Sequence, residues 1–123
     1  MIQVSNKQNG KLVHLKYEGV VTHDDYQKIL IPKLKKAIKT SSPLRAFCDM
    51  RTFEKIESKA MLDDFKFGIH HIKNFERIAT VGDQWWMSPL IKVSNLFLRK
   101  MELKHFKSKE YKEAQKWLDK KQS

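Results

Sequence analysis

The stretch NGKLVHLKYEGVVTHDDY, residues 9–26, contains the change from strand to helix that decides the fold. Apolar side chains occupy every second position from Val13 to Tyr17, and this period of two predicts a strand over residues 11–18. Asn9-Gly10 favours a type I′ turn, which would pair this strand with a first strand over residues 2–5. From Thr22 onward the pattern predicts a helix, because Thr22 can cap free amides and two aspartates follow it.

The first helix is predicted over residues 22–39. Pro32 falls inside its apolar stripe, and a proline at that place removes an amide donor, so we expect a kink. A turn over residues 40–43 leads to a third strand over 44–49, and residues 50–57 are predicted as a loop. The apolar stripe of this helix consists of Tyr26, Ile29, Leu30, Leu34, Ala37 and Ile38.

The remainder of the chain alternates helices with strands. Helical crossovers between strands require a mostly parallel sheet, so only the first hairpin is expected to be antiparallel. The predicted fold is α/β, with a five-stranded mixed, mostly parallel sheet and four helices mainly on one face. The further predicted elements are a helix over 58–73 capped by Ser58, a strand over 77–81, a helix over 84–100, a strand over 103–106 and a final helix capped by Ser108.

Composition limits the architecture and the expected location. The chain has 123 residues, 41% of them apolar, which predicts one domain over residues 1–123. Its single cysteine, Cys48, cannot form an internal disulfide, and no secretory signal pattern precedes the polar stretch at 5–11, so the cytoplasm is the expected location. The formal charge of +11 favours anionic partners, although a basic surface without a dedicated partner explains the charge equally well.

Four short motifs point to a known family. They are YEGVVTHDDY at 17–26, FCDM at 47–50, WW at 85–86 and AQKWL at 114–118. With this layout the chain resembles the SpoIIAA-like family, which is related to STAS domains and more loosely to CRAL-TRIO lipid-carrier domains. The resemblance implies a single STAS-like domain. It also implies a cleft between the two central helices and the sheet, able to hold an apolar or amphiphilic ligand near membranes.

Ser58 stands where STAS anti-sigma antagonists carry a phosphorylatable serine. The sequence there is CDMRTFEKIESKAM, residues 48–61, and it lacks the neighbouring Ser-Gly of their DSSG-like turn. We therefore interpret the Ser58 hydroxyl as a helix cap and do not carry the phosphoswitch role over to this chain.

No catalytic or metal-binding motif is recognisable in the sequence. Metal ligands recur at i and i+4 on a helix or as Cys-x-x-Cys, and the adjacent His70 and His71 fit neither pattern. Cys48 has no base that the sequence places beside it, so we expect it to pack in the core. Phosphate loops and nucleophile elbows are also missing. We expect a non-enzyme with no catalytic residues, metal or cofactor.

The predicted third helix is apolar around most of its circumference. Trp86, Leu90, Val93 and Phe97 form a predicted core-facing stripe that Met87, Ile91 and Leu98 broaden. A surface helix normally has a wider polar face, so this helix is either buried almost all round or presents apolar surface as a lid over a ligand. The ligand-binding candidates are Phe65, Ile69, Trp86, Leu90 and Phe97, and the membrane-contact candidates are Trp85, Met87, Lys92 and Arg99.

The leading functional hypothesis is a domain that binds a small hydrophobic or amphiphilic, lipid-like molecule, with peripheral contact to an anionic membrane. The alternative is a protein-protein interaction or regulatory module of the STAS type, and self-association into a homodimer is also left open. Nucleic-acid binding is the least favoured reading, since it would depend on Phe47 and Lys16 lying on an exposed sheet face.

Overall fold

The computed structural model describes residues 1–95 and 101–120, and over these residues the chain forms one five-stranded sheet. The strands lie in chain order. The first two pair antiparallel and all later neighbours pair parallel, as predicted. The strands are β1 (Ile2–Lys7), β2 (Leu12–Val21), β3 (Leu44–Ile56), β4 (Phe75–Val81) and β5 (Glu102–Phe106).

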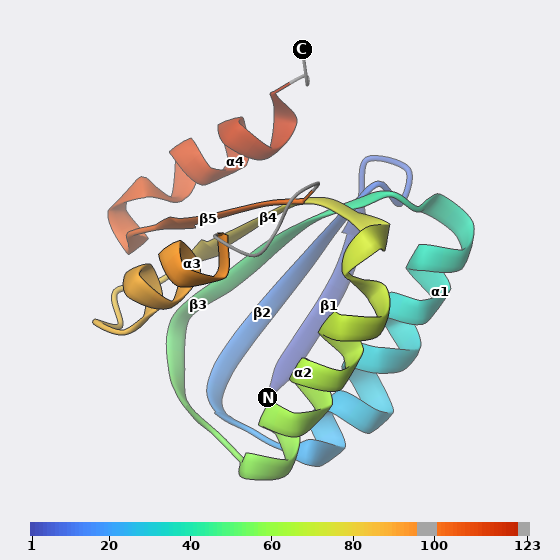
Figure 1. Ribbon diagram of the computed structural model, residues 1–123, viewed down its shortest axis with the longest axis horizontal. Coiled ribbons are helices and arrows are strands. Elements are labelled where there is room, and N and C mark those ends of the chain that lie inside the picture. The colour runs from blue at the N-terminus through green and yellow to red at the C-terminus, as the bar shows by residue number, and fades with distance from the viewer. Residues whose placement is uncertain (96–100, 121–123) are drawn as a thin grey trace.

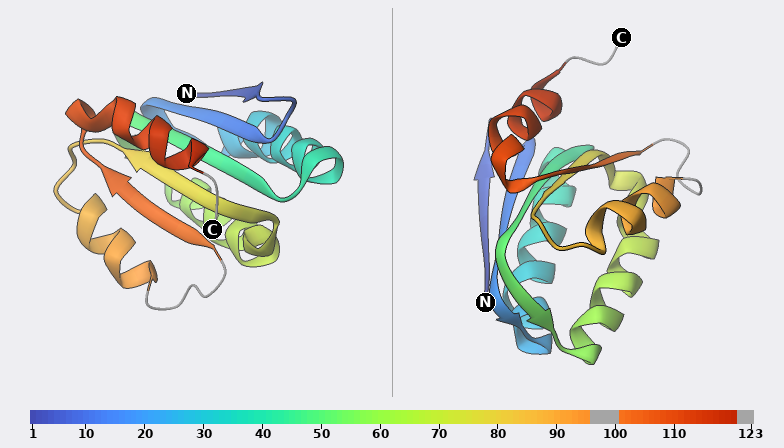
Figure 2. Two further views of the ribbon diagram at one scale, coloured as in Figure 1. Left: turned by 90° about the horizontal axis from the view of Figure 1, so that it is seen from above. Right: turned by 90° about the vertical axis from the view of Figure 1, so that its left-hand side faces the viewer.

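The helices cover the two faces of the sheet unequally (Figure 1). Figure 2 shows α1 (Ile31–Ser41), α2 (Ser58–His71) and α3 (Met87–Asn95) on one side and α4 (Tyr111–Asp119) on the other. This arrangement confirms the predicted mixed α/β architecture with helices mainly on one face. Three short helical segments complete the connections: η1 (Asp25–Leu30, a π-helix), η2 (Ile72–Asn74) and η3 (Ser108–Glu110).

The turn between β1 and β2 is longer than the predicted two-residue turn. Lys7 pairs with Leu12, and the four residues between them include Gln8, Asn9 and Gly10 at φ values of 52°, 58° and 85°. A Cβ atom at position 10 would also lie 2.7 Å from Ser41 Oγ, so Gly10 allows the turn to approach the last residue of α1. The turn is thereby packed against the end of α1.

The third strand corrects our prediction of a loop after Asp49. β3 continues to Ile56, and its parallel pairing with β2 extends to the partners Val21 and Ile56 through two register shifts. The physical reason is that β2 also runs beyond its predicted end. Each strand then gives the other a hydrogen-bonding partner, and Phe53 on the extension is buried in the core.

The helix changes type just before Pro32. Residues 25–30 form the π-helical segment η1, and Pro32 occupies the first turn of α1, where its missing amide hydrogen is not needed. Tyr26 and Leu30 of η1 are buried together with Leu34 and Ala37 of α1. The predicted apolar stripe therefore packs on the sheet even though part of it lies in the π-helical segment η1.

Two hydrophobic clusters lie on opposite faces of the sheet. The larger one is built on Val13, Leu15 and Tyr17 of β2 and joins residues of η1 and α1. The smaller one joins Phe47 to residues of β4, β5 and α4. Phe47 is only 1% exposed and contacts Tyr111 of α4 edge-on at 5.0 Å, so the expectation of an exposed Phe47 on an open sheet face is wrong.

Candidate functional site

Exposed apolar side chains concentrate on α2 and around α3. Within residues 1–95 and 101–120, nine large apolar side chains are exposed, and four of them lie on α2. Three more lie in α3 or just before it. We call these seven the apolar residues of α2 and α3: Met61, Leu62, Phe65, Ile69, Trp85, Leu90 and Val93. Exposed large apolar side chains on two helices of one sheet side make this side a candidate interaction surface.

The exposure on α2 follows from the way in which this helix is attached. Ala60 is its one fully buried residue, and Tyr26 of η1 donates a hydrogen bond from its hydroxyl to Asp64 Oδ1 at 2.9 Å. Asp63 Oδ1 accepts a hydrogen bond from Gln27 Nε2 at 3.0 Å, and Asp63 Oδ2 lies 2.5 Å from His23 Nδ1. Hydrogen bonds to η1 and to His23 thus orient α2, and its apolar stripe is turned away from the sheet.

The apolar face of α2 points to solvent. Leu62, Phe65 and Ile69 are 57%, 66% and 60% exposed, and Ile72, which follows α2, is partly buried against the core. Phe67 is the aromatic residue of α2 that packs against the main cluster.

The two tryptophans just before α3 differ in their exposure to solvent. Trp85 is 87% exposed, whereas Trp86 is partly buried and contacts Phe53 edge-on at a ring distance of 6.2 Å. Met87 is 2% exposed, so our prediction of Met87 as a membrane contact is wrong. Its side chain fills the space beside Gly82, where a Cβ atom would lie 3.0 Å from the Met87 sulfur.

The candidate ligand-binding residues do not enclose one site. Phe65, Ile69 and Leu90 are exposed on the side of the sheet that carries α2 and α3, and Trp86 belongs to the core. Leu90 and Val93 are both 54% exposed, which corrects the expected core-facing stripe of α3. Lys92, a membrane-contact candidate, is exposed. Phe97 and Arg99 lie outside the described residues.

Burial changes the pKa values of two groups in the core, Cys48 and Tyr26. Burial raises the pKa of the Cys48 thiol to about 12, so the thiol is protonated at neutral pH. Burial also raises the pKa of Tyr26, whose hydroxyl is the donor to Asp64. In the part of the chain that the structure describes, no three His, Cys, Asp or Glu side chains converge in a way that could hold a metal ion.

The sequence interpretation missed a pair of arginines near the C-terminal end of α4. Arg45 Nη1 donates to Leu118 O at 2.8 Å, and Arg77 Nη1 donates to Trp117 O at 2.8 Å and Lys120 O at 2.6 Å. Both arginines stand near the start of a parallel strand. The carbonyl ends of helices gather at that end of a parallel sheet, and an arginine early in such a strand is the signal that could have predicted this contact.

Of the helices in the described ranges, none combines the length and the apolar character needed to cross a bilayer.

Comparisons with known proteins agree with this architecture. A family model described as SpoIIAA-like matches residues 12–119. The crystal structure of an uncharacterised protein with a SpoIIAA-like fold from Shewanella loihica PV-4 is similar, with 29% sequence identity and a TM-score of 0.76. The alignment covers 96% of this chain and 92% of that protein. A search of curated proteins found no match.

Proposed function

This chain belongs to the SpoIIAA-like family, and from that premise we propose that it is a non-enzymatic binding module for a small hydrophobic or amphiphilic ligand. The observation that carries the proposal is the exposure of the seven apolar residues of α2 and α3. Leaving such side chains in water forfeits about 25 cal/mol for each Å² of apolar surface that could be buried. A ligand or surface that covers them would recover this free energy.

Basic side chains on the same two helices support peripheral contact with an anionic membrane. Lys59 and Lys66 on α2 and Lys92 on α3 are exposed, and none of them forms an ion pair with the described residues. Each lysine near an anionic surface adds about 1 kcal/mol of attraction. Exposed apolar residues such as Trp85 and Phe65 would then supply the second, hydrophobic contribution.

The alternative is that the same residues form a protein interaction surface of a regulatory module. This reading uses the same exposed side chains and differs only in the partner. Nucleic-acid binding loses support, because Phe47, the aromatic residue on which it depended, is covered by α4.

The test combines vesicle sedimentation with extraction of the purified protein. Phosphatidylcholine vesicles with phosphatidylglycerol should sediment the wild-type chain at low salt, and pure phosphatidylcholine vesicles should do so only weakly. Phe65→Ser should weaken sedimentation severalfold. The matched control is Val20→Ser, which changes an apolar residue that is 39% exposed on β2, and it should bind like wild type.

Extraction separates the two readings. Organic extraction of freshly purified wild-type protein should release an amphiphile that mass spectrometry detects, in smaller amount from Phe65→Ser. If neither vesicle type sediments the protein and the extract contains no amphiphile, the ligand proposal is wrong and the protein-interaction reading takes its place.

A further inference from the structure

The two edges of the sheet differ in their protection against pairing with another chain. β5 forms one edge and β1 the other. On β5, Glu102 and Lys104 are charged and exposed, and Asn95 Nδ2 donates to Leu103 O at 2.7 Å. β1 has no proline, pairs with β2 in one unbroken register and carries a single charged side chain, Lys7, at its last residue. Charges, prolines and bulges are the usual protection of a sheet edge, so β1 is the edge that is open to a further strand.

The pairing of β1 with β2 determines which backbone groups of β1 face its free edge. Met1 and Glu18 exchange two hydrogen bonds, Met1 N to Glu18 O at 2.7 Å and Glu18 N to Met1 O at 2.8 Å. In an antiparallel pair such residues alternate with residues whose N–H and C=O groups point away from the partner strand. In the register of β1 and β2 these outward-facing residues are Ile2, Val4 and Asn6. Figure 2 shows β1 at the margin of the sheet, and no described element lies beyond it.

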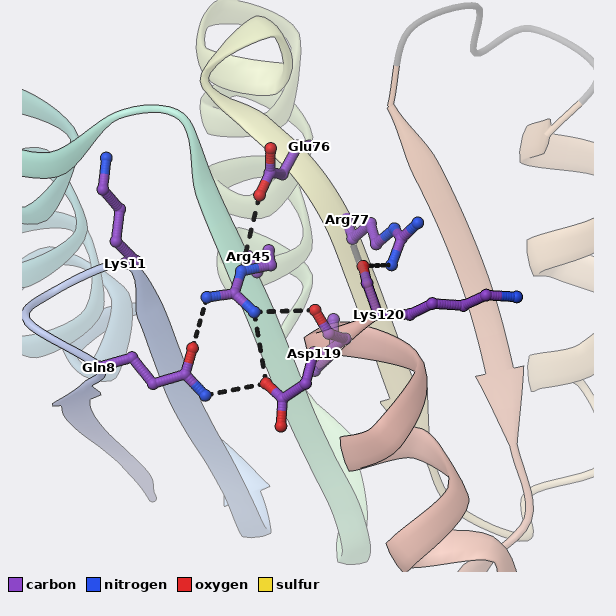
Figure 3. A pocket seen from close by; sticks show the side chains of 8 residues that line it. Gln8, Lys11, Arg45, Glu76, Arg77, Asp119 and Lys120 are labelled. Carbon is purple, nitrogen blue, oxygen red and sulfur yellow. Dashed lines mark hydrogen bonds and ion pairs between the residues drawn. The ribbon is translucent and has the colours of Figure 1, made fainter. Parts of the chain in front are cut away.

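Both ends of β1 are fixed by contacts within the chain. Just before its start, the Met1 ammonium group lies 3.5 Å from Asp25 Oδ2. Just after its end, Figure 3 shows Gln8 of the β1–β2 turn between Arg45 and Asp119. Gln8 donates from Nε2 to Asp119 Oδ1 at 2.8 Å and accepts a hydrogen bond from Arg45 Nη2. A strand that is already ordered loses little conformational entropy when it binds a partner.

We propose that β1 pairs antiparallel with β1 of a second copy of this chain, which joins the two five-stranded sheets into one continuous sheet. With a two-fold axis at Val4, Val4 pairs with Val4 of the second copy, and Ile2 pairs with Asn6 of the second copy. The outward N–H and C=O groups of all three residues then become hydrogen-bonded. The same strand serves both copies, as a two-fold axis requires.

The charges on β1 suit this pairing with itself. All side chains from position 2 to position 6 are uncharged, so like charges do not meet along the centre of the pair, even though each copy has a net charge of +11. Lys7 falls opposite Met1 of the second copy, where the carboxylate of Asp25 is close to the ammonium group. The pairing uses none of the apolar residues of α2 and α3 and does not depend on their function.

The first experiment measures the mass of the particle by light scattering after size exclusion, over a range of protein concentrations. Wild type should approach twice the monomer mass as the concentration rises. Asn6→Pro removes an outward N–H from an exposed position and should weaken dimerisation about tenfold or more, equivalent to about 1.4 kcal/mol. The matched control, Asn6→Ala, keeps the N–H and should dimerise like wild type. Circular dichroism verifies that both variants fold.

Cysteine cross-linking tests the register. Gln3 falls opposite Ser5 of the second copy in a pair without hydrogen bonds, where Cα atoms lie about 4.5 Å apart, within reach of a disulfide. An oxidised mixture of Gln3→Cys and Ser5→Cys should contain the mixed disulfide-linked dimer, and each variant oxidised alone should form a dimer much more slowly. Cys48 is buried and does not compete.

Three results would overturn the proposal. Wild type that stays monomeric at every concentration shows no pairing between copies. A dimer that forms equally well in Asn6→Pro, or cross-linking that is equally fast in the mixture and in the separate variants, shows that the copies associate through another surface.

Discussion

The residue at the N-cap position of α2, Glu57, uses its side chain for a contact outside the helix. Glu57 is the N-cap residue with extended backbone, φ −65° and ψ 148°, but its side chain forms no cap hydrogen bond. Glu57 Oε1 instead accepts the backbone N–H of His23 at 2.8 Å. Ser58 is therefore the first helical residue and does not cap, which corrects our interpretation of its hydroxyl. The missing Ser-Gly of the DSSG-like turn is unaffected by this correction.

We therefore predict that Ser58→Ala changes the free energy of unfolding by no more than about 0.5 kcal/mol, as expected for an exposed position without a special contact. Urea denaturation followed by circular dichroism measures this. A loss of about 1 kcal/mol, the usual effect of removing a serine cap, would contradict the structure at this residue.

At the scale of elements, α4 is fixed to the sheet by a small apolar cluster and by guanidinium groups. Ala114 and Leu118 are buried against Phe47 and its neighbours, and Trp117 is partly buried. The guanidinium carbon of Arg77 lies 5.3 Å from the centre of the Trp117 ring. Because Arg77 also donates to two carbonyls at the end of α4, it contributes both hydrogen bonding and packing.

Replacing Arg77 by methionine should lower the free energy of unfolding by about 2 to 4 kcal/mol, because a buried charged donor to two carbonyls is lost. The control is Lys116→Met, a change at an exposed position of α4, which should stay within about 0.5 kcal/mol of wild type. Chemical denaturation measures the free energy of unfolding of both variants. If the two variants are equally stable, Arg77 does not hold α4.

The two central helices differ in how far the sequence could predict them. On α1 the apolar stripe and the buried face coincide, so periodicity was sufficient to identify Leu34 and Ala37. On α2 the stripe of Leu62, Phe65 and Ile69 also marks the apolar side, but periodicity cannot say which side meets the sheet. That choice depends on bonds to Tyr26, Gln27 and His23, which are distant in sequence.

The same limit applies to the candidate sites. Exposed apolar residues such as Phe65 could be named from the sequence as functional candidates, because aromatic and aliphatic residues at helical spacing stand out. The polar contacts at the C-terminal end of α4 could not all be predicted in this way. Gln8 and Asp119 stand at opposite ends of the chain, and only the fold brings them within hydrogen-bonding distance, 2.8 Å.

For the molecule as a whole, stability is expected to be unevenly distributed over its layers. The central strands carry the main cluster, while α2 buries only Ala60 completely. Hydrogen-exchange mass spectrometry should therefore find amides of α2 exchanging about tenfold or more faster than those of α1, a difference of about 1.4 kcal/mol in opening free energy. Equal protection of the two helices would mean that the polar bonds to η1 hold α2 as firmly as apolar packing holds α1.

The order of the strands has a consequence for how the chain assembles during synthesis. Because each strand of the sheet pairs with the strand that precedes it in sequence, every strand that leaves the ribosome meets a partner that has already been made. No later strand has to insert between two earlier ones. The sheet can thus grow from one edge as translation proceeds, and the nascent chain exposes a single growing edge to other proteins in the cell at any moment.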